Sequence, residues 1–491
     1  MTLASRQCTG VGVTSADRRA DGRRQTGWLI VVGVLGFAVG MGLLAGFNGL
    51  RASTADPRPT AEADAVADSS GAPAAAIATD SWGRGLLLAG PRIDHDAPPV
   101  VFAEDGPVVI TGTVTNDAVV LARGAEVEQD GSRFTLSFEG EPPESIFAIT
   151  PAGRSNTEPL DIAIVPSRVT VDEIRALHVS FYGWVDSRLR DPILEMVEEG
   201  RINTVQLDLK DESGMIGYDS TLPLAEQAGT NAAIFDLREA VRELHERDVH
   251  VIGRIVAFAD PAFVRWGWDN DHRDSVVQTP DGQVYTGRYA GFTNPANDTI
   301  RQYNIDIAVE AAKAGVDGIL WDYIRRPDGS LDNFRFVGLD DSDPTDEIVS
   351  FVAEADEALA PYQVEHGVSV YGIAATRPGQ IAQDIAGMSE HVDYVAPMLY
   401  PSHWGPGEYG VADPNRQPYD IIYRSLAGFI DITEDKRARV VPWLQDFSLG
   451  VTYGEAEVRA QLDAARDAGI PEWIMWDAHV RYTRAAYDPV D

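Results

Sequence analysis

The feature that most constrains this chain is an alternation of apolar strand-like runs and helical segments that repeats eight times after residue 174. The runs are RALHVSFYGW (175–184), INTVQLDLKD (202–211), VHVIGRIVAF (249–258), VDGILWDYIR (316–325), GVSVYGIAA (367–375), VDYVAPMLYP (392–401), RVVPWLQDF (439–447) and EWIMWDA (472–478). Helical segments with apolar residues at three- and four-residue spacing lie between them, among others at 232–247, 299–315, 345–360 and 455–469. Eight such units predict an α/β fold, a parallel (β/α)8 TIM barrel, over residues 169–491. Because only residues 478–491 follow the last strand, we expect the eighth helix to be short or absent.

In a barrel of this kind the active site lies at the carboxyl ends of the strands, so the side chains at these ends carry the functional argument. Acidic residues and aromatic rings recur there. The acidic residues are Asp208, Asp211, Asp322, Asp446 and Asp477. The tryptophans at or near strand ends are Trp184, Trp321, Trp404, Trp443 and Trp476.

This combination is typical of sites that cleave sugars. Glycoside hydrolysis uses one carboxyl group as acid and a second as nucleophile or base, about 5–5.5 Å apart for retention and about 6.5–9.5 Å apart for inversion. Indole and phenol rings pack on the apolar faces of sugar rings. We therefore predict substrate-binding roles for Lys210, Asp211, Arg254, Trp321, Tyr323, Tyr400, His403, Trp404, Glu408, Trp443, Trp476 and Asp477. For each tryptophan, a place in the core is an equally open alternative.

Three aspartates are the catalytic candidates. Asp322 leads, because it ends the fourth strand beside Tyr323; an ion pair with Arg325 or Arg326 is the alternative. Asp446 lies among apolar rings, whose low dielectric raises a carboxyl pKa toward that of a general acid; substrate binding or simple pairing is the alternative. Asp208 is the third candidate for either role.

Further side chains near the strand ends have narrower expected roles. Lys210 is close enough in sequence to keep Asp208 ionised. Tyr400 and His403 are expected to bond substrate or a catalytic carboxylate, or to be structural. Glu408, in a glycine-rich loop, is a further candidate acid, and Asp477 is expected to orient sugar hydroxyls.

The amino-acid composition argues against several classes of function. The chain has 76 acidic against 40 basic residues, a net charge of −36, which disfavours nucleic acid as a partner because such binding relies on Lys and Arg. Its single cysteine, Cys8, makes a thiolate zinc site or a cysteine nucleophile unexpected. We find no metal-binding spacing, phosphate loop or cofactor motif, so no metal and no cofactor are predicted.

The start of the chain has a different character from the rest. Residues 1–26 carry five arginines and two aspartates, and residues 27–50 are apolar and long enough to cross a bilayer. We therefore predict a cytoplasmic tail, a transmembrane signal-anchor helix and, over residues 51–80, a disordered linker rich in Ala, Asp, Ser and Pro. This predicts a single-pass protein of the cell membrane with an extracytoplasmic barrel. Secretion after signal cleavage is the alternative.

Residues 81–168 show a third pattern, of short alternating apolar runs separated by turns. The runs are 107–114, 118–122, 132–138, 145–150 and 160–165. Asp130-Gly131 favours a hairpin because glycine accepts positive φ. The pattern predicts a small all-β sandwich that resembles immunoglobulin-like accessory domains.

Several long motifs of the barrel region occur in the order found in one known family. They are NTVQLDLKDESGMIGYDS (203–220), DGILWDYIRRP (317–327), residues 392–426 and VVPWLQDF (440–447). With them the chain resembles the glycoside hydrolase family known as domain of unknown function 4015, over roughly residues 174–484. The resemblance implies a (β/α)8 barrel related to glycoside hydrolases. Ser369 stands where the family pattern tends to have an acidic residue.

Together these patterns predict an enzyme that hydrolyses O-glycosidic bonds of a polysaccharide by carboxylate acid/base catalysis. The competing class is a non-catalytic barrel that binds cell-envelope glycan. Geometry separates the two. Hydrolysis requires Asp322 to lie within about 5–10 Å of Asp446 or Asp208 across an open cleft, whereas carboxylates held in arginine bridges favour binding.

Overall fold

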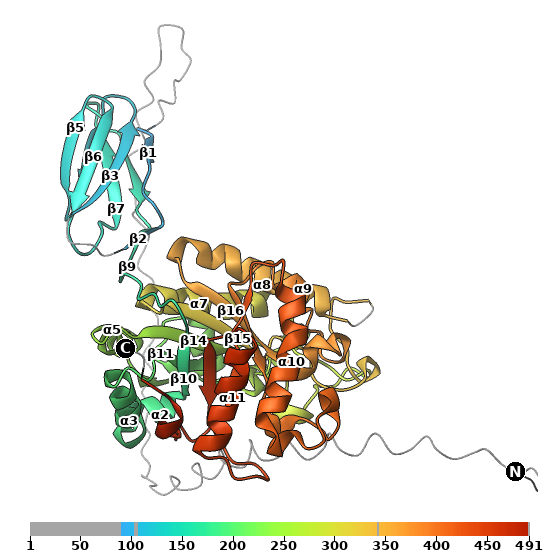
Figure 1. Ribbon diagram of the computed structural model, residues 1–491. Helices are drawn as coiled ribbons and strands as arrows, with labels where there is room; N and C mark the ends of the chain where they lie inside the picture. The colour runs from blue at the N-terminus through green and yellow to red at the C-terminus, as the bar shows by residue number, and fades with distance from the viewer. Residues whose placement is uncertain (1–89, 103–106, 341–342, 490–491) are drawn as a thin grey trace, which may run out of the picture. The chain divides into compact units, whose positions relative to one another are not determined.

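The computed structural model describes residues 90–102, 107–340 and 343–489. Its larger part is a closed barrel of parallel strands surrounded by helices (Figure 1). The barrel strands are β10 (Arg175–Val179), β11 (Thr204–Lys210), β14 (His250–Val256), β15 (Gly318–Asp322), β16 (Glu365–Tyr371), β17 (Tyr394–Met398), the pair β18 (Arg439–Val440) and β19 (Trp443–Gln445), and β20 (Trp473–Trp476). Neighbours follow this order, and β20 pairs with β10 to close the ring. The predicted (β/α)8 barrel is confirmed, with one barrel strand in each predicted run.

The helices lie outside the strands and cover the barrel wall (Figure 1). They are α2 (Phe181–Val185), α3 (Ser187–Glu198), α4 (Pro223–Ala228), α5 (Leu237–His245), α6 (Pro261–Asp269), α7 (Asp298–Ala314), α8 (Thr345–Leu359), α9 (Ile385–Met388), α10 (Pro418–Thr433) and α11 (Glu455–Asp467). The described residues after β20 form only a short 3-10 turn, η10 (Arg484–Ala486).

Two boundaries differ from the predicted ones because polar side chains cap helices. The first run was expected to be strand to residue 184, but Ser180 Oγ accepts a hydrogen bond from the N–H of Gly183 and starts α2. The helical segment 232–247 was expected to begin at residue 232, but Asp236 caps α5, which therefore begins at Leu237. The residues before Asp236 form β13 (Asn231–Phe235), which pairs with β12 (Ile216–Tyr218) beside the barrel.

The seventh barrel strand is interrupted by a proline. Pro442 lies between β18 and β19 and has no N–H to give to the ladder. Its carbonyl still accepts from the N–H of Ile474, at 2.9 Å. The strand direction is therefore kept, and residues 443–445 reach the carboxyl end of the barrel.

Inward-facing side chains fill the barrel as a packed core. Ile252, Leu320, Tyr394 and Trp443 belong to one buried cluster inside the ring. A Cβ on Gly367 would lie 2.2 Å from the Tyr394 ring, so glycine is required where this large ring crosses the interior. The outward faces pack against the helices in a second, larger core.

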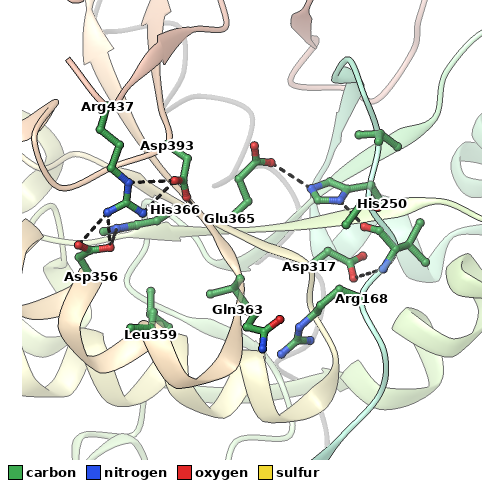
Figure 2. A pocket seen from close by; sticks show the side chains of 15 residues that line it. Arg168, His250, Asp317, Asp356, Leu359, Gln363, Glu365, His366, Asp393 and Arg437 are labelled. Carbon is green, nitrogen blue, oxygen red and sulfur yellow. Dashed lines mark hydrogen bonds and ion pairs between the residues drawn. The ribbon is translucent and has the colours of Figure 1, made fainter. Parts of the chain in front are cut away.

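The amino end of the barrel holds a cavity of about 550 Å³, and several of the residues that line it form ion pairs (Figure 2). Arg437 bonds Asp356 and Asp393, and His250 Nε2 lies 3.4 Å from Glu365. The guanidinium of Arg168 bonds the carbonyls of Tyr362, Val316 and Ala312. Charges at this end satisfy one another, and this end of such barrels serves stability rather than chemistry.

The described residues before the barrel form an all-β region. One sheet contains β1 (Ile93–His95), β3 (Val108–Val114), β6 (Arg133–Phe138) and β5 (Glu126–Asp130); a second contains β4 (Val119–Ala122), β7 (Ser145–Ile149) and β8 (Ser155–Pro159); β2 (Val100–Phe102) pairs with β9 (Ala163–Val165). Residues from the first two sheets share one core. The predicted hairpin at Gly131, with φ +58°, is confirmed. An immunoglobulin-like topology and the boundary at residue 169 stay predictions.

The predicted cell-membrane location is wrong as far as the described residues go. Across residues 90–102, 107–340 and 343–489, no helix is long and apolar enough to span a bilayer. The longest of these helices, α7, has 17 residues and carries Arg301, Glu310 and Lys313. The predicted tail, anchor and linker, and with them the membrane partner and the cleavage site, lie outside the described residues.

Candidate active site

Arg254 is the centre of the polar cluster at the carboxyl end of the barrel. Its Nη1 donates to Asp208 Oδ1 at 2.7 Å, its Nε and Nη2 donate to Asp322 Oδ2 at 3.0 and 2.6 Å, and its Nη2 also bonds Glu212. One guanidinium therefore joins three carboxylates from β11, the loop after it and β15. Glu212 was missed by the sequence argument, although it directly follows the strand-end residue Asp211.

Strand register brings these groups together. Asp208 and Arg254 are register partners on β11 and β14, and Asp322 lies two residues beyond Leu320, the register partner of Arg254 on β15. Side chains two apart on a strand share a face, so all three point into the barrel. Burial alone would lower the pKa of Arg254, but the three carboxylates raise it. The cation also lies over the Trp443 ring, 5.6 Å from its centroid.

Asp322 is held on both of its oxygens. Oδ1 accepts from the N–H of Tyr323 at 2.7 Å, and Oδ2 accepts from Arg254. Tyr323 has a φ of +52°, a costly conformation for a residue with a side chain. The expected alternative partners bond elsewhere: Arg325 to Tyr371 and Asp328, and Arg326 to backbone carbonyls.

Asp208 is fixed by Arg254 and by His178, whose Nε2 lies 3.0 Å from Oδ1. Burial would raise the pKa of Asp208, but these two contacts bring it below its usual value. Lys210, which was expected to do this and to bind substrate, is fully buried in the barrel wall. There it bonds Asp260 at 2.7 Å and Asn304 at 3.0 Å. A bulge in the ladder between residues 208 and 210 accompanies this change of direction.

Asp211 has the environment of a proton donor. Its Oδ1 accepts from the N–H and Oγ of Ser213, at 2.9 and 2.5 Å. Burial and the negative charge of Glu212 raise the pKa of Asp211 to about 7. Partial burial raises the pKa of Tyr182, and the negative charge of Asp211 raises it further. Tyr182 was not selected from the sequence, and 61% of its surface is exposed.

The other two acidic candidates are engaged with the end of the described chain. Both oxygens of Asp446 accept hydrogen bonds from Thr483, and Oδ2 also accepts from the hydroxyl of Tyr487. Burial raises the pKa of Asp446, as expected, but the carboxyl is occupied by these donors. Asp477 Oδ1 accepts from the N–H of His479 at 2.6 Å.

Four rings form an aromatic rim above the barrel: Tyr400, His403, Phe447 and Trp476. Tyr400 stacks on Trp476 with centroids 5.2 Å apart, and His403 meets Tyr400 edge-on at 5.3 Å. Burial raises the pKa of Tyr400, and the negative charge of Asp322 raises it further, so the rim lies beside the carboxylate cluster.

The remaining tryptophans that were expected to bind substrate are core residues. Trp321 is fully buried, donates to His366 Nε2 at 2.6 Å and packs on Phe351 of α8. Trp443 is buried beneath Arg254, and Trp404 packs against Tyr409 with 8% of its surface exposed. Glu408 forms an ion pair with Arg377 at 3.0 Å. In the residues that the structure describes, no group of three or more His, Cys, Asp or Glu side chains could hold a metal ion.

Comparison with known proteins gives one family match. The family named domain of unknown function 4015 and described as "Putative glycosyl hydrolase domain" matches residues 176–482. No curated protein matches the chain.

Solved structures to which this chain is similar include a hypothetical protein from Ruminiclostridium thermocellum ATCC 27405, at 24% identity over 42% of this chain and 98% of that one, with a TM-score of 0.35. The PgaB (BpsB) glycoside hydrolase domain from Bordetella bronchiseptica is 15% identical over 63% of this chain and 95% of that one, with a TM-score of 0.47. TtGalA, an alpha-galactosidase from Thermus thermophilus, is 14% identical over 76% and 71%, with a TM-score of 0.39.

Proposed function

The chain belongs to the domain of unknown function 4015 family of glycosyl hydrolase-like barrels, and from this membership we propose that it hydrolyses O-glycosidic bonds of a polysaccharide. The observation that carries the proposal is the grouping of Asp208, Glu212 and Asp322 around Arg254, with Asp211 beside them. It supplies two kinds of carboxyl group at the carboxyl end of the barrel. One is fixed by hydrogen-bond donors, and the other has a pKa near neutrality.

Asp322 is the carboxylate that faces the anomeric carbon in this proposal. It either attacks that carbon directly or removes a proton from the attacking water. Arg254 and the N–H of Tyr323 hold both of its oxygens in place, which fixes the direction of attack.

Asp211 is the proposed general acid. With a pKa of about 7 it carries a proton in a large fraction of molecules at neutral pH. It gives this proton to the glycosidic oxygen as the bond to the anomeric carbon breaks, so the leaving sugar departs as a neutral alcohol. Asp208 keeps Arg254 in position and is a supporting group rather than the acid.

A non-catalytic, glycan-binding barrel is the second candidate, and one observation favours it. Asp208 and Asp322 share Arg254, which is the arrangement expected of a binding site. The geometric criterion that separates hydrolysis from binding compares Asp322 only with Asp446 and Asp208, and it does not consider Asp211 or Glu212. Among the described residues, Asp211 has no arginine partner. The site therefore also contains an acid that no cation bridges to another carboxylate, and we place hydrolysis first.

The proposal is tested by incubating the full chain with neutral, amino-sugar and acidic polysaccharides and measuring newly formed reducing ends. Asp322→Asn is expected to abolish release of reducing ends while glycan binding, measured by calorimetry, persists. The matched control is Asp248→Asn, because Asp248 is exposed at the amino end of β14 and its positive φ suits asparagine equally well. Binding without cleavage by the wild-type chain would favour the second candidate. Cleavage that survives Asp322→Asn would remove Asp322 from the mechanism.

A further inference from the structure

A chain of hydrogen bonds on the aromatic rim determines which nitrogen of His403 carries the proton. Ser402 and His403 belong to η7 (Pro401–His403), and Gln445 ends β19. Ser402 Oγ lies 3.0 Å from His403 Nδ1 and 2.8 Å from Gln445 Oε1. Gln445 Nε2 lies 2.7 Å from the carbonyl oxygen of Phe447.

The orientation of the Gln445 amide follows from its neighbours. A backbone carbonyl can only accept, so the group facing Phe447 must be the NH2. The opposite atom, Oε1, then accepts from the N–H of Ser402 at 3.0 Å and from its hydroxyl at 2.8 Å. This orientation satisfies all three contacts, whereas the flipped amide would leave the N–H of Ser402 and the carbonyl of Phe447 without a partner.

The single hydroxyl hydrogen of Ser402 is therefore directed at Gln445. Ser402 Oγ can only accept toward His403, so Nδ1 of the imidazole must be the donor. A neutral imidazole carries one N–H, which leaves Nε2 as an unprotonated acceptor. An imidazole with the ordinary pKa of about 6.5 is already mostly neutral above pH 7.

The unprotonated nitrogen is open to a ligand. His403 is exposed, and no hydrogen bond to its Nε2 comes from any residue in the described part of the chain. The centroid of its ring lies 5.3 Å from that of Tyr400 and 6.0 Å from that of Phe447. An apolar surface next to a lone acceptor matches a sugar ring that presents a hydroxyl from its edge.

We propose that His403 Nε2 accepts a hydrogen bond from a hydroxyl of the bound glycan, and that Ser402 and Gln445 fix the tautomer that makes this possible. The inference rests on the proposed function, because it requires a glycan bound at the carboxyl end of the barrel. It also specifies what the position rejects. A carboxylate or sulfate group has no proton to give and would face the lone pair of Nε2, so a hydroxyl is selected there over an anionic substituent.

Nuclear magnetic resonance of the full chain with ¹⁵N-labelled histidine tests the tautomer without any glycan, and His403→Gln identifies the His403 signals. The expected spectrum has a protonated Nδ1 and an unprotonated Nε2 above pH 7. Ser402→Ala is expected to shift the population toward the other tautomer. Ser350→Ala, on the outer helix α8, is the matched control and should leave the His403 signals unchanged. A wild-type spectrum with the proton on Nε2 would overturn the inference.

The sugar contact is tested by calorimetric titration with oligosaccharides released from a glycan that the chain cleaves or binds. Ser402→Ala and His403→Gln should each weaken binding roughly three- to tenfold, the cost of one hydrogen bond, with kcat changed less than the affinity. Unchanged affinity in both variants, or the absence of glycan binding by the wild type, would overturn the contact even where the tautomer is as stated. If binding is weakened but no glycan is hydrolysed, the contact holds and the catalytic proposal fails.

Discussion

Arg254 donates two hydrogen bonds to a single oxygen of Asp322, from Nε at 3.0 Å and from Nη2 at 2.6 Å. The remaining N–H groups of this guanidinium are shared with Asp208 and Glu212. These two bonds fix the position of Oδ2, and the N–H of Tyr323 on Oδ1 fixes the second oxygen and with it the plane of the carboxylate. The stability of the carboxyl end of the barrel and the aim of Asp322 therefore depend on the same side chain.

Two substitutions of Arg254 should distinguish the effect of its positive charge from the effect of its planar hydrogen-bonding geometry. Arg254→Met leaves three carboxylates without their cation, so the free energy of unfolding should fall by about 3–5 kcal/mol. Arg254→Lys keeps the charge but loses the planar fork, so it should cost less stability while lowering the rate of hydrolysis by about 10²-fold. Urea unfolding and initial rates measure the two effects. Arg242→Met, at an exposed site, is the control and should change stability by less than about 0.5 kcal/mol. A loss below about 1 kcal/mol for Arg254→Met would contradict this view of the cluster.

The pH dependence of hydrolysis should report Asp211. A general acid works only while it is protonated, so kcat/KM should fall as the pH rises through about 7, where Asp211 titrates. Asp211→Asn should reduce the rate by about 10²–10⁴-fold and remove this alkaline limb. Asp248→Asn should keep both the rate and the profile. An alkaline limb that persists in Asp211→Asn would assign it to a different group.

Asp446 should prove to be a stabilising residue. Its oxygens accept from Thr483 and Tyr487, so Asp446→Asn turns an amide NH2 toward a donor and should lower the free energy of unfolding by about 1–3 kcal/mol. Tyr487→Phe should lower it by a similar or smaller amount. Hydrolysis at saturating glycan should be retained in both variants. Lost activity with unchanged stability in Asp446→Asn would restore Asp446 as a catalytic candidate.

His250 should make stability depend on pH at the amino end of the barrel. Burial would lower the pKa of His250, but the contact with Glu365 and the charge of Asp317 raise it above its usual value. A raised folded-state pKa means that the contribution is full below about pH 6.5 and is lost as the pH rises through the folded-state pKa. Urea unfolding between pH 5.5 and 8.5 should therefore show the advantage of the wild type over His250→Asn shrinking with rising pH. A constant difference would contradict the assignment.

The barrel could be predicted from sequence because each strand and helix leaves its own periodicity, and eight repeats allow few closed arrangements. The strand-end rule also selected Asp208, Arg254 and Asp322, which do meet. Two errors concern the direction in which a strand side chain points, and the first came from ignoring the alternation of side chains along a strand. Trp321 is adjacent to Asp322 and must therefore face the helices, where it bonds His366. Lys210 faces outward because of a bulge, which no sequence pattern indicates.

Other parts of the site depend on contacts between distant segments. The partner of Asp446 is Tyr487, 41 residues later, and no local pattern relates them. The apolar neighbours of Asp446 correctly predicted a raised pKa, but they could not show that donors already occupy its oxygens. The tautomer of His403 likewise requires Gln445 and Phe447, on a different strand end, to be seen together with Ser402.

The pairing of β10 with β20 also sets an order of events during synthesis on the ribosome. Residues 175–179 emerge early, and the strand that completes their hydrogen bonding is not translated until residues 473–476. Until then the growing sheet has open edges, which are prone to pairing with other chains. The slow step of folding is therefore expected to be the joining of these two strands.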